Sequence, residues 1–204
     1  MSRPSKVFGI GLSRTGTKSL SAALKRLGYS AVHYPTDRGT LKTLLTTDAH
    51  AGDFPCLRTN DSLTDITAAA YFEDLDRLYP GSKFVLTIRD ETDWLDSCRR
   101  HWSKSPCELD QKSPAHQRIK MQVKALLRNR VYGTEQFEPD TFLSAYRAHN
   151  ARVLKYFENR PDDLLVINIP AGDGYEKLTA FLGKPILYEA FPHIGSNSIG
   201  AMSK

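Results

Sequence analysis

The sequence predicts a three-layer α/β domain, in which a parallel sheet is flanked by helices on both faces. Three observations predict it. Short apolar runs alternate with segments of helical periodicity along the 204 residues. Residues 83–88, Lys-Phe-Val-Leu-Thr-Ile, form a continuous run typical of a strand buried on both faces. Residues 6–34 contain a strand, a glycine-containing turn, a helix and a second strand, which is the pattern of a βαβ unit.

The first half of the chain is divided by glycines and prolines. An apolar run at 6–10 predicts the first strand, and leucines and alanines at helical spacing predict a helix over 17–27 that ends at Gly28. Residues 29–34 are expected to form the second strand, 40–45 a short helix and 54–59 a third strand. Helical periodicity returns over 66–79 and is closed by Pro80 and Gly81.

The second half is expected to be mostly helical. Residues 94–102 predict a helix capped by Asp93, and residues 103–140 a polar, basic insertion with a helix at about 117–130. A strong amphipathic helix is expected over 141–159, followed by a last strand at 164–169 and a last helix at 174–182. The expected core contacts of the helix at 141–159 are Phe142, Tyr146, Val153, Leu154 and Phe157. We therefore expect a single domain over residues 1–204.

Composition sets wide limits. The charged fraction is 25%, the net charge is +5 and the pI is about 9.1, so a polyanionic ligand, nucleic acid or an acidic membrane would all be attracted. The three cysteines form no C-x-x-C pair and no disulfide framework. No apolar run is long enough for a membrane span, and the first residues do not resemble a signal peptide. A cytoplasmic location is the expectation.

The turn after the first strand is the first candidate site. Residues 11–19, Gly-Leu-Ser-Arg-Thr-Gly-Thr-Lys-Ser, lie between a strand and a helix, so free backbone N–H groups and the positive end of the helix dipole point at one place. Gly16 permits close approach of the backbone. Arg14 and Lys18 add charge, and hydroxyls can donate hydrogen bonds. The predicted anion-binding residues are Ser13, Arg14, Thr15, Gly16, Thr17, Lys18 and Ser19.

This turn differs from a Walker A motif. G-x-x-x-x-G-K-[ST] requires lysine directly after the second glycine, whereas Thr17 stands there and the lysine is Lys18. The extra residue displaces the lysine along the helix. The spacing therefore argues against a nucleoside triphosphatase.

A second candidate site follows the strand at 83–88. Arg89 leaves the end of that strand, on the edge where parallel sheets bind ligands, and Ser97 lies eight residues later on the next helix. A guanidinium and a hydroxyl brought together by a strand-to-helix turn can clamp a phosphate.

The two segments together resemble the sulfotransferase superfamily, in particular a bacterial and fungal branch with a P-loop NTPase-like fold. The family's K-[ST]-G-T loop is similar to residues 14–17, with Arg14 where most relatives carry lysine. The family's strand-end arginine and the serine eight positions later match Arg89 and Ser97. Residues 79–90 and 189–197 also look like segments of that branch, while 103–140 are not covered.

The resemblance implies an enzyme that moves a sulfuryl group from 3′-phosphoadenosine 5′-phosphosulfate (PAPS) to a hydroxyl or amine, without a metal. It implies that Arg89 and Ser97 bind the 3′-phosphate and that Arg14 and Lys18 act on the transferring group. The acceptor is expected to be a small molecule, a glycan or a lipid.

A hydroxyl acceptor also needs a general base. His33 and Asp61 are the candidates, because they are expected at the ends of the second and third strands.

Two alternatives remain open from the sequence. An ATP- and magnesium-dependent small-molecule kinase would use Asp90 at the strand end as a metal partner, although Arg89 would then place a cation beside the metal. A non-catalytic nucleotide- or nucleic-acid-binding module would use the basic insertion. Its cations are expected on several helix faces without interleaved aromatic residues, so a solvated face is the preferred interpretation and no nucleic-acid partner is expected.

Overall fold

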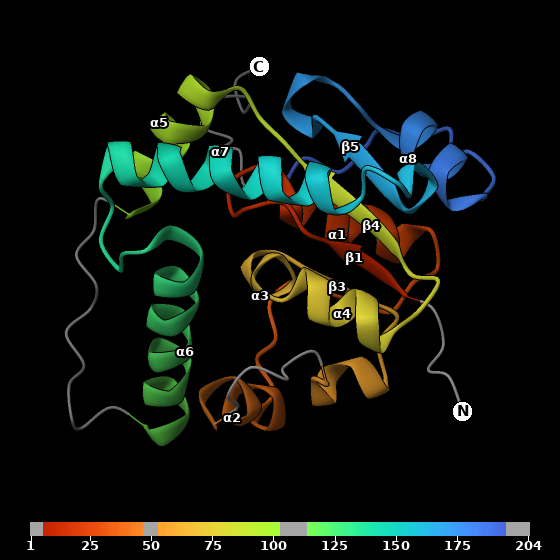
Figure 1. Cartoon of the computed structure of the whole chain (residues 1–204). Coiled ribbons are helices and arrows are strands. Elements are labelled where there is room, and N and C mark those ends of the chain that lie inside the picture. Colours follow the sequence, from red (N-terminus) through yellow and green to blue (C-terminus); the bar gives the residue numbers. More distant parts are fainter. Residues whose placement is uncertain (1–5, 47–52, 103–113, 195–204) are drawn as a thin grey trace, which may run out of the picture.

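The computed structural model describes residues 6–46, 53–102 and 114–194. Its centre is a five-stranded, all-parallel sheet with the strand order β2-β3-β1-β4-β5 (Figure 1). The strands are β1 (Val7–Gly9), β2 (Ala31–Val32), β3 (Ser62–Thr64), β4 (Lys83–Thr87) and β5 (Leu164–Ile167). The predicted α/β class with a parallel sheet is confirmed.

Helices cover both faces of this sheet. The α-helices are α1 (Thr17–Arg26), α2 (Arg38–Thr46), α3 (Ile66–Ala70), α4 (Phe72–Leu78), α5 (Glu91–Trp102), α6 (Ala115–Tyr132), α7 (Pro139–Tyr156) and α8 (Tyr175–Leu182). Short 3₁₀ turns are η1 (Pro55–Arg58), η2 (Pro161–Asp163) and η3 (Ile169–Ala171). In the described part of the chain, no helix combines the length and the apolar composition that crossing a bilayer requires.

Alternate residues of the strands feed two separate cores. Phe8 and Phe84 point into a large core, which α3, α4 and α7 cover. Their neighbours Val7 and Val85 point into a smaller core, which α1 and α8 cover. Because both faces of the sheet are covered by helices, the domain has three layers. Residues of β4 are therefore buried on either face, which explains why this strand appears in the sequence as a continuous apolar run.

The region after β2 differs from the prediction. Residues 54–59 are not a strand, because Pro55 begins the 3₁₀ turn η1, and the third strand is instead Ser62–Thr64. Pro lacks the N–H that a ladder requires, which favours the turn at that position. The correction moves Asp61 from the expected carboxyl end of a strand to the residue before β3.

Three smaller expectations were also wrong. The helix over 66–79 is interrupted at Tyr71, which separates α3 from α4. The carboxylate at the start of α5 that accepts a backbone N–H is Asp90, from Asp93 N at 3.1 Å, rather than Asp93. Leu154 on α7 is 50% exposed and outside the core, whereas His149 on the same helix is buried.

The basic insertion contributes to the core. Its residues 103–113 lie outside the described residues, but Val123, Leu127 and Tyr132 of α6 are buried in the large core. Figure 1 shows α6 standing beside α2 and next to one end of α7, and α6 contacts both helices. The helix therefore forms a wall beside α2 and α3, on the side of the domain where β2 is the edge strand.

Candidate active site

All five strands deliver residues to one cavity of about 800 Å³ at the carboxyl edge of the sheet. The segment after β1 supplies residues 13–14 and 16–19, while His33 follows β2, Asp65 follows β3, Arg89 follows β4, and Ile169 and Pro170 follow β5. This edge is where open parallel sheets bind ligands. The remaining lining comes from α5 and the closing segment: Ser97, Arg100, His101, His193 and Ile194.

The predicted anion-binding turn is built around the start of α1. Gly16 has a φ of 102° and stands at the N-terminal end of the helix, so the N–H groups of the first turn have no intrahelical acceptor. Thr17, Lys18 and Ser19 form that turn and line the cavity. The backbone donors and the helix dipole thus favour an anion at this point.

Thr15 differs from the other predicted residues of the turn. Its side chain is fully buried, donates to Leu12 O at 2.7 Å and pairs with Thr87 Oγ1 at 2.6 Å. Thr15 therefore does not line the cavity. It fixes the turn to the end of β4, and its hydroxyl is turned towards protein partners rather than towards the cavity, contrary to the expectation.

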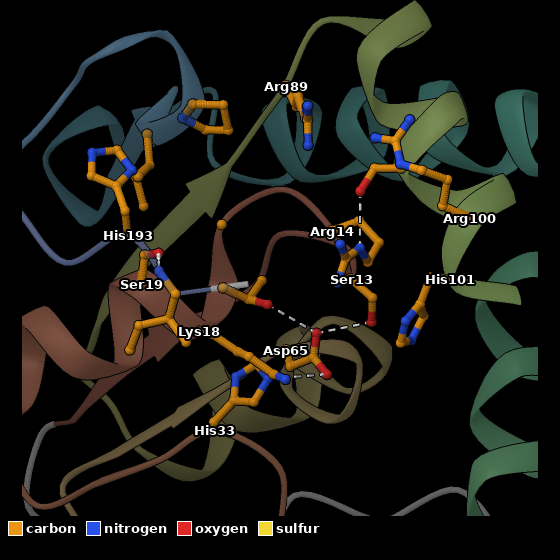
Figure 2. A pocket seen from close by; sticks show the side chains of 16 residues that line it. Ser13, Arg14, Lys18, Ser19, His33, Asp65, Arg89, Arg100, His101 and His193 are labelled. Carbon is orange, nitrogen blue, oxygen red and sulfur yellow. Dashed lines mark hydrogen bonds and ion pairs between the residues drawn. The ribbon is translucent and has the colours of Figure 1, made fainter. Parts of the chain in front are cut away.

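The second predicted cradle opens into the same cavity. Arg14 Nε donates to Ser97 Oγ at 3.0 Å, so the two cradles are in direct contact. Figure 2 shows the Arg89 guanidinium above Arg14, on the same side of the cavity. The Nε atom of Arg89 is buried and makes no hydrogen bond within the described residues. Arg89 Nη2 lies 4.0 Å from Oδ2 of the exposed Asp93, which is beyond hydrogen-bond distance, so the guanidinium keeps donors available for an anion.

Two aromatic residues hold the cradles in place. The Trp94 indole Nε1 donates to Ser13 O at 3.0 Å, and its ring stacks on Tyr146 with centroids 4.4 Å apart. The Tyr146 hydroxyl donates to Arg89 O at 2.7 Å and accepts from Arg89 N at 2.9 Å. The Trp94–Tyr146 pair, which was not predicted as part of the site, therefore couples the positions of both anion-binding segments.

Of the two candidate bases, only His33 lies in the cavity. Asp61 is at the opposite end of β3, where its carboxylate accepts from Ser30 Oγ at 2.7 Å, which holds the pKa of Asp61 below its usual value. The physical reason is the corrected strand: Asp61 precedes β3, and the residue that follows it is Asp65. The structure thus separates Asp61 from the other predicted site residues.

Asp65 is the carboxylate that the cavity contains. Its Oδ1 accepts from Ser13 Oγ at 2.9 Å and from Thr17 Oγ1 at 3.1 Å, and its Oδ2 lies 3.8 Å from His33 Nε2 (Figure 2). The sequence could have indicated Asp65 only through its position directly after Ser62–Thr64, if that short run had been assigned as a strand.

His33 is held on both sides of its ring. Its Nδ1 is 3.0 Å from Thr64 Oγ1, and its Nε2 faces Asp65. Burial lowers the pKa of His33, Asp65 opposes that shift and Lys18 adds to it. A lowered pKa keeps the imidazole neutral near pH 7, which is the state that can accept a proton.

Backbone strain is concentrated at this site. Among the described residues, only two that are not glycine have a positive φ, Arg14 at 76° and Asp65 at 77°, and both line the cavity. Such conformations cost about 1–3 kcal/mol each and persist where the surroundings impose them.

Positive charge dominates the lining. Arg14, Lys18, Arg89 and Arg100 face the cavity with one carboxylate, Asp65, which is already hydrogen-bonded. Within the described ranges, neither Arg14 nor Lys18 forms an ion pair. This lining, at the carboxyl edge of a parallel α/β sheet, favours a ligand with several negative charges.

Comparison with known proteins identifies the family to which this chain belongs. A model of the sulfotransferase domain matches residues 6–198, so the chain belongs to the sulfotransferase domain family. The chain is also similar to the Ava biosynthesis cluster protein M of Aspergillus versicolor, at 26% identity over 93% of this chain and 80% of that protein. The crystal structure of a sulfotransferase from Alicyclobacillus acidocaldarius has a similar fold, with a TM-score of 0.52 over 99% of this chain and 87% of that one, at 16% identity.

Proposed function

We propose that this protein transfers a sulfuryl group from PAPS to a hydroxyl or amine of a small acceptor. The observation that carries the proposal is that both anion cradles open into one cavity and touch through the Arg14–Ser97 hydrogen bond. One ligand with negative groups at both ends can therefore occupy both. Membership of the sulfotransferase domain family supports the same donor.

The residues fit a bisphosphorylated donor. Arg89 has a buried Nε without a partner, and Arg89 and Ser97 would bind the 3′-phosphate. The first turn of α1, with Arg14 and Lys18, would bind the phosphosulfate end. PAPS, when bound, supplies a sulfuryl group on a good leaving group. In this proposal the positive charge that stabilises the transfer comes from side chains and backbone N–H groups rather than from a metal ion.

His33 is the proposed general base. It is neutral because of its lowered pKa, it faces the cavity, and its orientation is fixed by Thr64 and Asp65. With Nδ1 donating to Thr64 Oγ1, the proton of the acceptor hydroxyl would be taken by Nε2, which lies 3.8 Å from Asp65 Oδ2 and is not hydrogen-bonded to it. Asp65 is proposed as a positioning residue that also stabilises the imidazolium that forms.

Calorimetry tests the donor site. We expect metal-independent binding of 3′-phosphoadenosine 5′-phosphate (PAP), and Arg89→Ala should weaken it by roughly ten- to hundred-fold, the loss typical of a charge-assisted hydrogen bond. Arg99→Ala is the matched control, because Arg99 lies on α5 outside the cavity, in an ion pair with Asp96. It should leave PAP affinity unchanged.

Two parallel titrations distinguish the alternatives. Tighter binding of ATP with magnesium than of PAP would favour a kinase, and tight binding of a short DNA duplex would favour a nucleic-acid module. Either result would replace the sulfotransferase proposal. A cytoplasmic location stays a prediction from the sequence.

A further inference from the structure

A second cavity of about 320 Å³ adjoins the first. The two share five lining residues: Ser13, Lys18, His33, Asp65 and His101. The second cavity extends from the proposed base towards α6, away from Arg89 and Ser97, which do not line it. Its volume is near the lower end of the range for small-molecule sites.

The wall formed by α6 carries three cations on one side of the helix. Lys120, Lys124 and Arg128 are spaced four residues apart, and all three line the second cavity. The expectation that the cations lie on several helix faces was wrong for these three, of which Lys124 is exposed, Lys120 half-buried and Arg128 buried. Like charges at this spacing destabilise a helix by themselves, so a feature other than helix stability explains their alignment.

None of these three cations forms an ion pair within the described part of the chain, although the Glu135 carboxylate is near enough to Arg128 to oppose the lowering of its pKa by burial. Lys120 and Lys124 form no ion pair there, and Arg128 donates to a carbonyl, Glu135 O, at 3.2 Å. The Arg128 guanidinium also stacks over Trp102, 5.3 Å from the ring centroid. Partial desolvation lowers the pKa of Lys124, and the neighbouring Arg128 adds to that shift. A bound anion would relieve this repulsion.

The remaining lining of the second cavity is apolar and aromatic. Tyr34, Ile66, Trp102 and Met121 contribute it. Within the described residues, the Tyr34 hydroxyl and the Trp102 indole N–H are buried without a hydrogen-bond partner, which is rare in folded proteins. The site therefore combines surfaces for a flat ring with polar atoms that lack partners.

We propose that the acceptor is a small hydroxylated aryl acid, an inference that rests on the proposed function. Its hydroxyl would lie beside His33, its ring would pack against Trp102 and Tyr34, and its carboxylate would bind Lys120, Lys124 and Arg128. His33 takes the hydroxyl proton, the acceptor oxygen forms the bond to sulfur, and the bond from sulfur to the bridging oxygen of the donor breaks to release PAP. The 320 Å³ volume disfavours a glycan chain or a lipid as acceptor.

Matched pairs of ligands test the carboxylate. Calorimetry on the full chain saturated with PAP would compare 6-hydroxy-2-naphthoate, 4-hydroxycinnamate and 4-hydroxyphenylacetate with their neutral carboxamides. At least one acid should bind roughly ten-fold or more tightly than its amide, as expected for a charge-assisted contact. Equal binding within every pair, or no binding of any acid at millimolar concentration, would overturn the inference.

Variants locate the contact. Lys120→Met with Lys124→Met should abolish the preference for the acid while leaving PAP affinity and the amide's affinity unchanged. Lys42→Met removes one exposed charge from α2 outside both cavities and should change neither. If the double variant loses PAP affinity together with acid binding, these lysines belong to the nucleotide site and the inference fails. If the unaltered protein does not bind PAP, the proposed function fails instead, and the same acid–amide comparison without nucleotide still tests whether this cavity selects a carboxylate.

Discussion

The two ends of the site, called the nucleotide end and the acceptor end after the ligands proposed for them, are built in different ways. The nucleotide end is rigidly interconnected: Thr15 is fixed to Thr87, Trp94 to Ser13, and Tyr146 to Arg89. At the acceptor end, the lysines of α6 have no partners in the described residues, and Tyr34 and Trp102 have polar atoms without hydrogen bonds. At the first end these contacts fix the anion-binding segments to one another and leave their cations facing the cavity, whereas at the second end the cations stand on a single helix. We therefore expect the donor end to be preformed and the acceptor end to be completed by its ligand.

The largest expected effect tests whether His33 belongs to the chemistry at the acceptor end. His33→Ala should lower kcat by about 10²–10⁴, the usual contribution of a general base, with PAP affinity within two-fold of the unaltered protein. The measurement is PAP formation with the best aryl acid, alongside calorimetry. Because the pKa of His33 is lowered, activity should be limited by its protonation only below about pH 6.5.

His101→Ala is the control for this variant. His101 lines both cavities, but among the residues that the structure describes it has no carboxylate paired with it as Asp65 is with His33. It should lose less than about ten-fold in kcat. Equal losses in the two variants would remove His33 from the role of base.

The second largest expected effect is a loss of stability at acid pH, caused by protonation of His149, whose side chain contacts the residue directly after β1, before the phosphate turn. Buried His149 lies 2.8 Å from Ile10 O through Nε2, and burial lowers its pKa to about 4. In the unfolded chain this histidine binds a proton more readily, with a pKa of about 6.5, so the contribution of neutral His149 to the free energy of unfolding is fully present above that pH. The free energy of unfolding should then fall by about 3 kcal/mol as the pH drops from 6.5 to 4.

Denaturant unfolding between pH 4 and 7.5 measures this loss. His149→Gln keeps a side-chain amide near Ile10 O without a titratable group, and its stability should depend less on pH in the same interval. A pH slope unchanged in that variant would assign the acid sensitivity to other groups.

The third effect tests how closely the phosphate turn packs on β4. A Cβ at Gly11 would lie 2.8 Å from the backbone nitrogen of Thr87 and still closer to its Oγ1. Gly11→Ala should therefore lower the free energy of unfolding by about 1–3 kcal/mol and weaken PAP binding. Gly174→Ala is the matched control, since its Cβ would make an ordinary contact of 3.5 Å with Phe191. A well-folded Gly11→Ala variant with full PAP affinity would contradict the rigid picture of this end.

The smallest effect compares two tryptophans. Trp94→Phe removes the hydrogen bond to Ser13 O and should cost about 1 kcal/mol beyond the change in ring size. Trp102→Phe removes an indole N–H that has no partner in the described residues, so no hydrogen bond is lost. Thermal unfolding of the two variants gives the difference. Indistinguishable losses would mean that the Trp94 contact does not stabilise the turn.

The sequence predicts the nucleotide end well, because that end depends on local patterns. Glycine spacing, the strand-to-helix order and the eight-residue interval from Arg89 to Ser97 are all contiguous features. The structure brings those two residues and most of the turn to one cavity, with Thr15 turned inward. The helices and the parallel sheet follow from hydrophobic periodicity for the same reason.

The acceptor end is not predictable in this way, because its residues come from elements distant in the chain. Asp65 and His33 meet only because β2 and β3 are neighbours, and β3 is three residues long, too short for a clear pattern. A proline-initiated turn nearby had a stronger β-like composition than the true strand, which led to Asp61. The alignment of Lys120, Lys124 and Arg128 is visible at four-residue spacing, but its meaning depends on α6 facing the sheet edge.

The positive φ angles of Arg14 and Asp65 also have a consequence for protein engineering. Glycine adopts this backbone conformation without steric cost, so a search for heat-resistant variants that ignores catalysis would favour glycine at both positions. Each such replacement would remove a charged group from the proposed reaction centre. Improved melting temperature and the proposed activity should therefore be selected together in this member of the sulfotransferase domain family, and these two positions kept unchanged in any library.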